Sequence, residues 1–225
     1  MRREISLEEI SDGRLYRSND MVKADSGDCR GCSACCCGMG ESIVLDPLDI
    51  HRMSQGLGQS LEQLLEKGVA LHVEDGLILP HLKMCGGDER CFYLNEEGRC
   101  SIHSFRPGIC RLFPLGRYYE DQDFCYFLQI HECRNQNRTK VKVRKWIDTP
   151  ELARYEQYVR DWHYFLKDLQ EQLMTQTDGF SEEKARKLSM YVLKQFFMIP
   201  FDAERDFYVQ FADRLEQAGQ VVRNV

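Results

Sequence analysis

The spacing of apolar residues in the last third of the chain predicts three helices. Apolar side chains recur every three or four positions over residues 152–173, which is typical of an amphipathic helix, and Thr149-Pro150 precede it as a cap and a first-turn proline. Similar spacing predicts a second helix over 181–197 and a third over 202–218. This part of the chain is therefore expected to form a helical layer.

The first two-thirds of the chain shows shorter patterns, some typical of helices and some typical of strands. We expect hairpins over 69–82, 91–102 and 116–130, a strand over 42–45, and short helices over 47–55 and 61–67. The predicted fold class is α+β, with short antiparallel hairpins and loops and a C-terminal helical layer. We expect a lead-in over 1–24 with one helical turn at 7–10, a cysteine-rich domain over 25–147, and a helical subdomain over 148–225 packed on it.

Composition narrows the class of protein. The chain has 225 residues, of which 43% are hydrophobic and 29% charged, as in ordinary soluble proteins. A net charge of -6 disfavours nucleic-acid binding, which needs a basic face. The N-terminus is acidic where a signal peptide would be apolar, and no long apolar run predicts a membrane span, so we expect a cytoplasmic protein with no membrane contact.

Cysteine is the residue that stands out. Five of the eleven cysteines fall within nine residues, and they are Cys29, Cys32, Cys35, Cys36 and Cys37. In a reducing compartment such a cluster favours metal ligation over disulfides, because a C-x2-C loop turns two thiolates toward one point. Zinc and iron–sulfur clusters both accept these ligands, so the spacing leaves the element open.

A second series of cysteines follows, and two arginines accompany it. The cysteines are Cys85, Cys91, Cys100 and Cys110, and the predicted hairpin over 91–102 would bring the second and third together. Arg106 and Arg111 can neutralise thiolate charge or bind a carboxylate or phosphate of a cofactor. Pairing of these arginines with surface acids is the structural alternative.

Several spaced blocks together resemble a known family. They are Cys29-x2-Cys32-x2-Cys35-Cys36, Cys91-x-Tyr-Leu, Cys100-x-Ile and Arg106-Pro-x2-Cys110-Arg-x-Phe-Pro. Over roughly residues 25–135 the chain is similar to the CxxCxxCC cysteine-cluster family of zinc- or iron-chelating domains, which includes the flagellin N-methylases. The resemblance implies a metal-binding module, and an iron–sulfur centre fits the methylase branch.

The resemblance also implies a ligand set, with some departures. Its members are Cys29, Cys32, Cys35, Cys36, Cys91, Cys100, Cys110 and Cys133. His103 stands where the family leads us to expect an aromatic residue, and Cys37 and Cys85 are additions that inherit no role. The late cysteine of the family could be Cys125 or Cys133, and the neighbouring His131 favours the second.

Three functions agree with these residues. The first is a cysteine-cluster protein holding iron–sulfur or zinc in a structural and redox role. The second, by analogy with the methylases, is an S-adenosylmethionine-dependent protein-lysine N-methyltransferase, although no glycine-rich loop follows a predicted strand. The third is a metal carrier or redox-responsive module whose helical C-terminal region binds a protein partner. Nucleophilic catalysis with His103 or His131 as base explains the clustered thiols less well.

Overall fold

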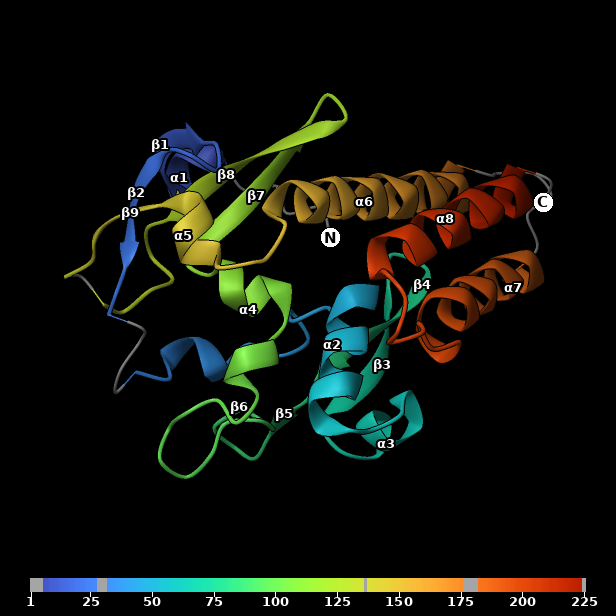
Figure 1. Cartoon of the computed structure of the whole chain (residues 1–225), viewed down its shortest axis with the longest axis horizontal. Helices are drawn as coiled ribbons and strands as arrows, with labels where there is room; N and C mark the ends of the chain where they lie inside the picture. The colour runs from blue at the N-terminus through green and yellow to red at the C-terminus, as the bar shows by residue number, and fades with distance from the viewer. Residues whose placement is uncertain (1–5, 28–31, 136, 176–181, 224–225) are drawn as a thin grey trace.

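The computed structural model describes residues 6–27, 32–135, 137–175 and 182–223, which combine short antiparallel sheets with helices (Figure 1). The predicted α+β class is confirmed. The elements, in chain order, are α1 Leu7–Ile10, β1 Ser11–Tyr16, β2 Met21–Asp25, the 3-10 helix η1 Ala34–Cys36, α2 Pro47–Leu57, α3 Leu61–Glu66, β3 Val69–Glu74, β4 Leu77–Leu82, β5 Met84–Cys85, β6 Arg90–Cys91, the 3-10 helix η2 His103–Phe105, α4 Gly108–Leu112, β7 Leu115–Glu120, β8 Asp123–Gln129, β9 Thr139–Lys142, α5 Val143–Ile147, α6 Leu152–Thr175, α7 Glu182–Leu193, the π-helix η3 Lys194–Met198 and α8 Phe207–Arg223.

The N-terminal segment belongs to the sheets. Strand β1 pairs with β8 at one edge of the sheet β1-β8-β7, and β2 pairs with β9. Val22 and Ala24 are buried on β2, since their alternation with exposed neighbours gives that strand one apolar face. The stretch that polarity indicated as a lead-in therefore contributes two strands, while its predicted helical turn, α1, is confirmed.

The hairpins β3–β4 and β7–β8 are confirmed, whereas the hairpin predicted over 91–102 is reduced to a short antiparallel contact across a tight turn. Strand β6 pairs with β5, through Met84 and Cys91, and the two predicted strands are joined by the isolated bridge of Leu94 to Cys100 and by hydrogen bonds from Ser101 to the Tyr93 carbonyl. A tight turn explains this, because the Asn95 side chain accepts a hydrogen bond from the Arg99 amide at 2.7 Å. The strand predicted over 42–45 is likewise reduced to one bridge.

The helices begin where local capping allows. Helix α2 opens on a capping box of Asp46 and Asp49, and α3 follows as predicted. Helix α6 begins at Leu152, because Glu151 has a left-handed φ of 50°, so the predicted cap at Thr149 is wrong. Helix α8 begins at Phe207 rather than 202.

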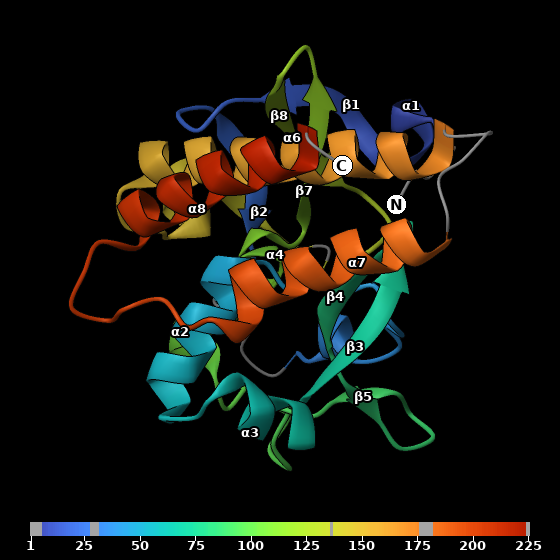
Figure 2. The same cartoon turned by 90° about the vertical axis from the view of Figure 1, so that its right-hand side faces the viewer.

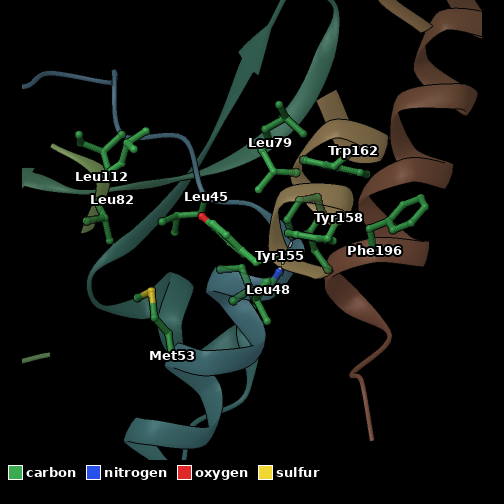
Figure 3. Close-up of a cluster of buried hydrophobic side chains, with 14 of the residues drawn as sticks. Leu45, Leu48, Met53, Leu79, Leu82, Leu112, Tyr155, Tyr158, Trp162 and Phe196 are labelled. Carbon is green, nitrogen blue, oxygen red and sulfur yellow. Dashed lines mark hydrogen bonds between the residues drawn. The ribbon is translucent and has the colours of Figure 1, made fainter. Parts of the chain in front are cut away.

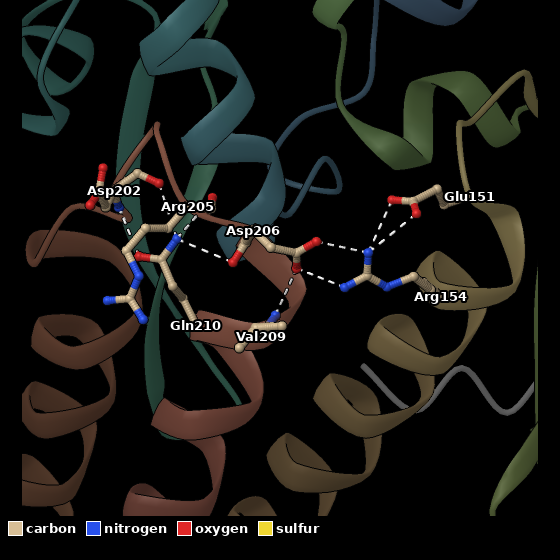
Figure 4. A network of polar contacts seen from close by, with 7 residues as sticks. All are labelled: Glu151, Arg154, Asp202, Arg205, Asp206, Val209 and Gln210. Atoms are coloured by element: carbon tan, nitrogen blue, oxygen red, sulfur yellow. Dashed lines mark hydrogen bonds and ion pairs between the residues drawn. The ribbon is translucent and has the colours of Figure 1, made fainter.

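The loop before α8 and the helix α6 are joined by a polar network (Figure 4). Arg154 on α6 donates to both carboxylate oxygens of Asp206, at 2.7 and 2.8 Å, and also to Glu151. Asp206 in turn accepts the Val209 amide at the start of α8, while Gln210 bonds to the loop backbone. These contacts keep residues 202–206 out of the helix.

The helical layer buries its apolar face on the cysteine-rich part of the chain. Helices α6 and α8 run beside each other with α7 below them (Figure 2). Tyr155, Tyr158 and Trp162 of α6 point toward Leu48 of α2 and Leu79 of β4 (Figure 3). One continuous core therefore includes both the sheets and the C-terminal helices.

Candidate metal centre

The first described cysteines lie on a tight turn. Cys35 and Cys36 belong to η1, in which the Cys36 amide donates to the Ser33 carbonyl at 2.8 Å. Cys37 then pairs with Arg90 in an isolated bridge, which fixes the turn against the β5–β6 hairpin. Cys29, the first predicted ligand, lies outside the described residues.

Two further cysteines reach the same region on neighbouring turns. Cys91 ends β6 and is buried, while the bridge of Leu94 to Cys100 brings the next cysteine back toward it. The Ser101 amide also donates to the Tyr93 carbonyl at 2.8 Å. The proximity that a hairpin would have given is thus produced by a shorter turn.

Cys110 lies on α4, and a buried carboxylate accepts a hydrogen bond from the first residue of that helix. Asp49 of α2 accepts the Gly108 amide at 2.7 Å, and its other oxygen accepts the Asp46 amide at 3.2 Å. Burial, reinforced by the charge of Asp46, raises the pKa of Asp49 well above its usual range. A single side chain therefore positions the beginnings of both α2 and the helix that carries Cys110.

The thiols influence one another across these segments. A hydrogen bond to Cys36, together with burial, raises the pKa of Cys35. Burial has the largest effect on Cys110 and raises its pKa. The charge of Asp49 raises that pKa further, and the neighbouring thiols Cys91, Cys35 and Cys100 add smaller effects in the same direction. Burial likewise raises the pKa values of Cys91 and Cys100. We call Cys35, Cys36, Cys91, Cys100 and Cys110 the thiol cluster.

Four other cysteines surround this thiol cluster, and one lies apart. Cys37 and Cys85 are close enough to Cys91 to act on its pKa, although sequence reasoning gave them no role. Cys32 and Cys133 line a small cavity of about 20 Å³ together with Cys35, which thereby lies between two groups of thiols. Cys125 is on β8, opposite Tyr118 of β7.

The two predicted arginines have different surroundings. The guanidinium of Arg106 contacts His103 Nε2 at 2.8 Å, and its positive charge opposes the raised pKa values of Cys35 and Cys100. Arg111 donates instead to the carbonyls of Ser104 and Asp148 and lines a separate cavity of about 730 Å³. Of the two predicted arginines, Arg106 is therefore the one that acts on the thiol cluster.

The cysteines have the chemistry of a metal site without a closed ligand shell. All ten cysteines among the described residues are free. Over residues 6–27, 32–135, 137–175 and 182–223, no three His, Cys, Asp or Glu side chains are arranged so that they could hold a metal ion. The donor set still suits zinc or an iron–sulfur cluster, because both take thiolates in fourfold coordination.

Comparison with known proteins gives one match. Residues 28–146, just over half of the chain, match the model of the CxxCxxCC family, described as "Putative zinc- or iron-chelating domain". No curated protein and no solved structure matches the chain significantly. In the part of the chain that the structure describes, none of the helices combines the length and apolar character of a membrane span.

Proposed function

Since the chain belongs to the CxxCxxCC family of zinc- or iron-chelating domains, we propose that its cysteine thiolates hold an iron–sulfur cluster or zinc, in a structural and redox role. Eight sulfurs suffice for two four-coordinate centres, or for one cluster with spare thiols. The proposed ligands are Cys29, Cys32, Cys35, Cys36, Cys91, Cys100, Cys110 and Cys133.

The observation that carries the proposal is the mutual influence of thiols from separate segments. Cys91, Cys35 and Cys100 each raise the pKa of Cys110 on α4, Cys100 raises the pKa of Cys91 on β6, and Cys35 on η1 raises the pKa of Cys100. Unpaired thiolates held this close would repel, so the thiol form is favoured. A nearby cation reverses that preference, and binding therefore releases protons.

Cys32 and Cys133 extend the same site. They share the small cavity with Cys35, which supports either a second centre or a larger ligand set around the first. Arg106 contributes by favouring the thiolate forms of Cys35 and Cys100. A bound zinc ion would tie these segments together, and an iron–sulfur cluster would in addition exchange an electron.

Elemental analysis and visible spectra of anaerobically purified protein test the proposal. We expect bound zinc, or iron with sulfide and a brown colour, and we expect Cys35→Ser and Cys110→Ser to lose metal. Cys125→Ser is the matched control, because Cys125 is a half-buried cysteine outside the thiol cluster. A folded wild-type protein without metal, or full metal content in both cluster variants, would contradict the proposal.

We also propose the domain that contains this site and the location of the protein in the cell. We assign the centre to a domain over 25–147, with the helices of 148–225 as a subdomain that shares its core. A cytoplasmic location agrees with ten free cysteines, which an oxidising compartment would tend to pair. Localising the tagged protein by cell fractionation tests this, and recovery outside the cytoplasm would contradict it.

A further inference from the structure

A cavity of about 730 Å³ lies between α2, the η2–α4 segment and the connection from α5 to α6. We propose that it binds a phosphorylated organic molecule, an assignment that does not depend on the metal centre. The residues used in the argument are Arg52, Arg111, Arg144, Phe105, Asp148 and Pro150.

Three guanidinium groups line this cavity, and their charges are not neutralised by carboxylate ion pairs. Arg111 donates to the backbone carbonyls of Ser104 and Asp148, which orient the guanidinium but carry no net charge. Its Nε is buried and has no hydrogen-bond partner. Among the described residues, neither Arg52 nor Arg144 forms a salt bridge or a side-chain hydrogen bond.

The balance of charge fits a phosphate group. Asp148 is the one carboxylate in the lining, and burial lowers the pKa of His51, so that ring is neutral at pH 7. Three arginines and one aspartate leave the wall about two charges positive, which matches the charge of about -2 on a phosphate monoester at pH 7. Planar guanidinium groups also suit phosphate oxygens, because they can donate two hydrogen bonds at once.

The size and walls of the cavity indicate an organic ligand rather than free phosphate. Cavities that hold small organic molecules are usually about 300–1,000 Å³. Phe105 and Pro150 supply apolar surface beside the arginines. The Phe105 ring lies so close to Gly56 that an added Cβ there would be 2.5 Å from the ring, so the glycine lets the ring pack on the helix backbone.

Such a concentration of positive charge is unexpected on an acidic protein. The chain carries a net charge of -6, yet α2, α4 and α5 each bring one arginine to this cavity. Arg144 comes from the only basic run of the sequence, over residues 138–145. Three like charges that have one carboxylate in the lining to offset them are kept together most readily where a ligand uses them.

Isothermal titration calorimetry of the full-length protein, in phosphate-free buffer, tests the proposal with pyrophosphate and ADP as probes. We expect both to bind with Kd below about 1 mM, ADP more tightly, and both more weakly at high salt. Arg52→Gln and Arg144→Gln should each raise Kd about ten-fold. Arg186→Gln is the matched control, because it removes the same charge from the exposed face of α7, and its Kd should stay within about two-fold.

The alternatives give different results. No saturable binding of either probe, or equal weakening by Arg186→Gln, would overturn the site. Binding of citrate in place of both probes would overturn its assignment to phosphate. Metal content measured for every variant separates this question from the metal centre, because a variant that keeps its metal and loses ADP has lost the cavity alone.

Discussion

Gly108→Ala tests the contact between the helix that carries Cys110 and the C-terminal layer. A Cβ added at Gly108 would be 2.3 Å from the Tyr155 hydroxyl oxygen, whereas real Cβ contacts almost never fall below 3.0 Å. Tyr155 is only 2% exposed, so the ring has no open space to enter. Its hydroxyl also accepts a hydrogen bond from Arg117 at 2.8 Å, which any displacement would weaken.

The magnitude follows from these two effects. Overpacking of a core costs about 1–3 kcal/mol, and a lost hydrogen bond to a charged group about 1.5–3 kcal/mol. Alanine recovers up to about 1 kcal/mol, because glycine loses more backbone freedom in a helix. We expect Gly108→Ala to lower the free energy of unfolding by about 1.5–6 kcal/mol, which for a chain of this size means a Tm roughly 3–24 °C lower.

Thermal and denaturant unfolding measure this loss, and Gly87→Ala is the control. Gly87 is exposed between β5 and β6, an added Cβ there meets no atom within 4 Å, and its backbone lies outside the left-handed region. That variant should keep the wild-type Tm within a few degrees. Equal stability of Gly108→Ala and Gly87→Ala would refute the reasoning, because both changes add the same methyl group and only the one at Gly108 meets other atoms.

Three further predictions concern the core, acid stability and the metal. Tyr158→Phe removes a buried hydroxyl that accepts the Leu48 amide at 3.0 Å, so a urea titration should show a loss of about 1–3 kcal/mol; no loss would contradict this role. Burial, aided by Lys167, lowers the pKa of His163 to about 4, so the unfolded chain takes the proton first and stability falls as the pH drops from about 6.5 to 4. His163→Phe, which keeps a ring on Tyr119, should be less acid-sensitive than the wild type by about 1–2 kcal/mol between pH 7.5 and 4.5, and equal sensitivity would contradict the assignment. Removal of metal by a chelator should speed amide exchange in the cysteine-rich segments more than in α6 and α8, and uniform exchange after complete removal would argue against a metal-linked fold.

Local patterns were sufficient to predict much of the fold. Apolar spacing and caps gave α2, α3, the hairpins β3–β4 and β7–β8, and most of α6. The pairing of residues 11–25 with β8 and β9 could not be predicted, because it joins segments that are far apart in the sequence. The start of α6 was missed because the left-handed backbone of Glu151 depends on its surroundings and not on its side chain.

The metal centre and the arginine cavity could likewise be predicted only in part from the sequence. The clustering of cysteines in the sequence indicated metal chemistry, but which thiols act on one another depends on the turn at Asn95 and on the carboxylate of Asp49. The capping-box pattern Asp46-Pro-Leu-Asp49 marked the start of α2 and was the one local signal for Asp49. For the arginine cavity the sequence singled out Arg111 alone as an anion ligand, because Arg52 and Arg144 come from distant helices.

The pairing of β2 with β9 has a consequence for synthesis of the chain. Cys32 leaves the ribosome roughly a hundred residues before Cys133, and the strand that closes this region, β9, comes later still. At about 5–20 residues per second, the early thiols wait roughly 5–20 s without their late partners. Cells that make this protein under oxidative stress should therefore lose its first cysteines to oxidation during translation more readily than after the chain is complete.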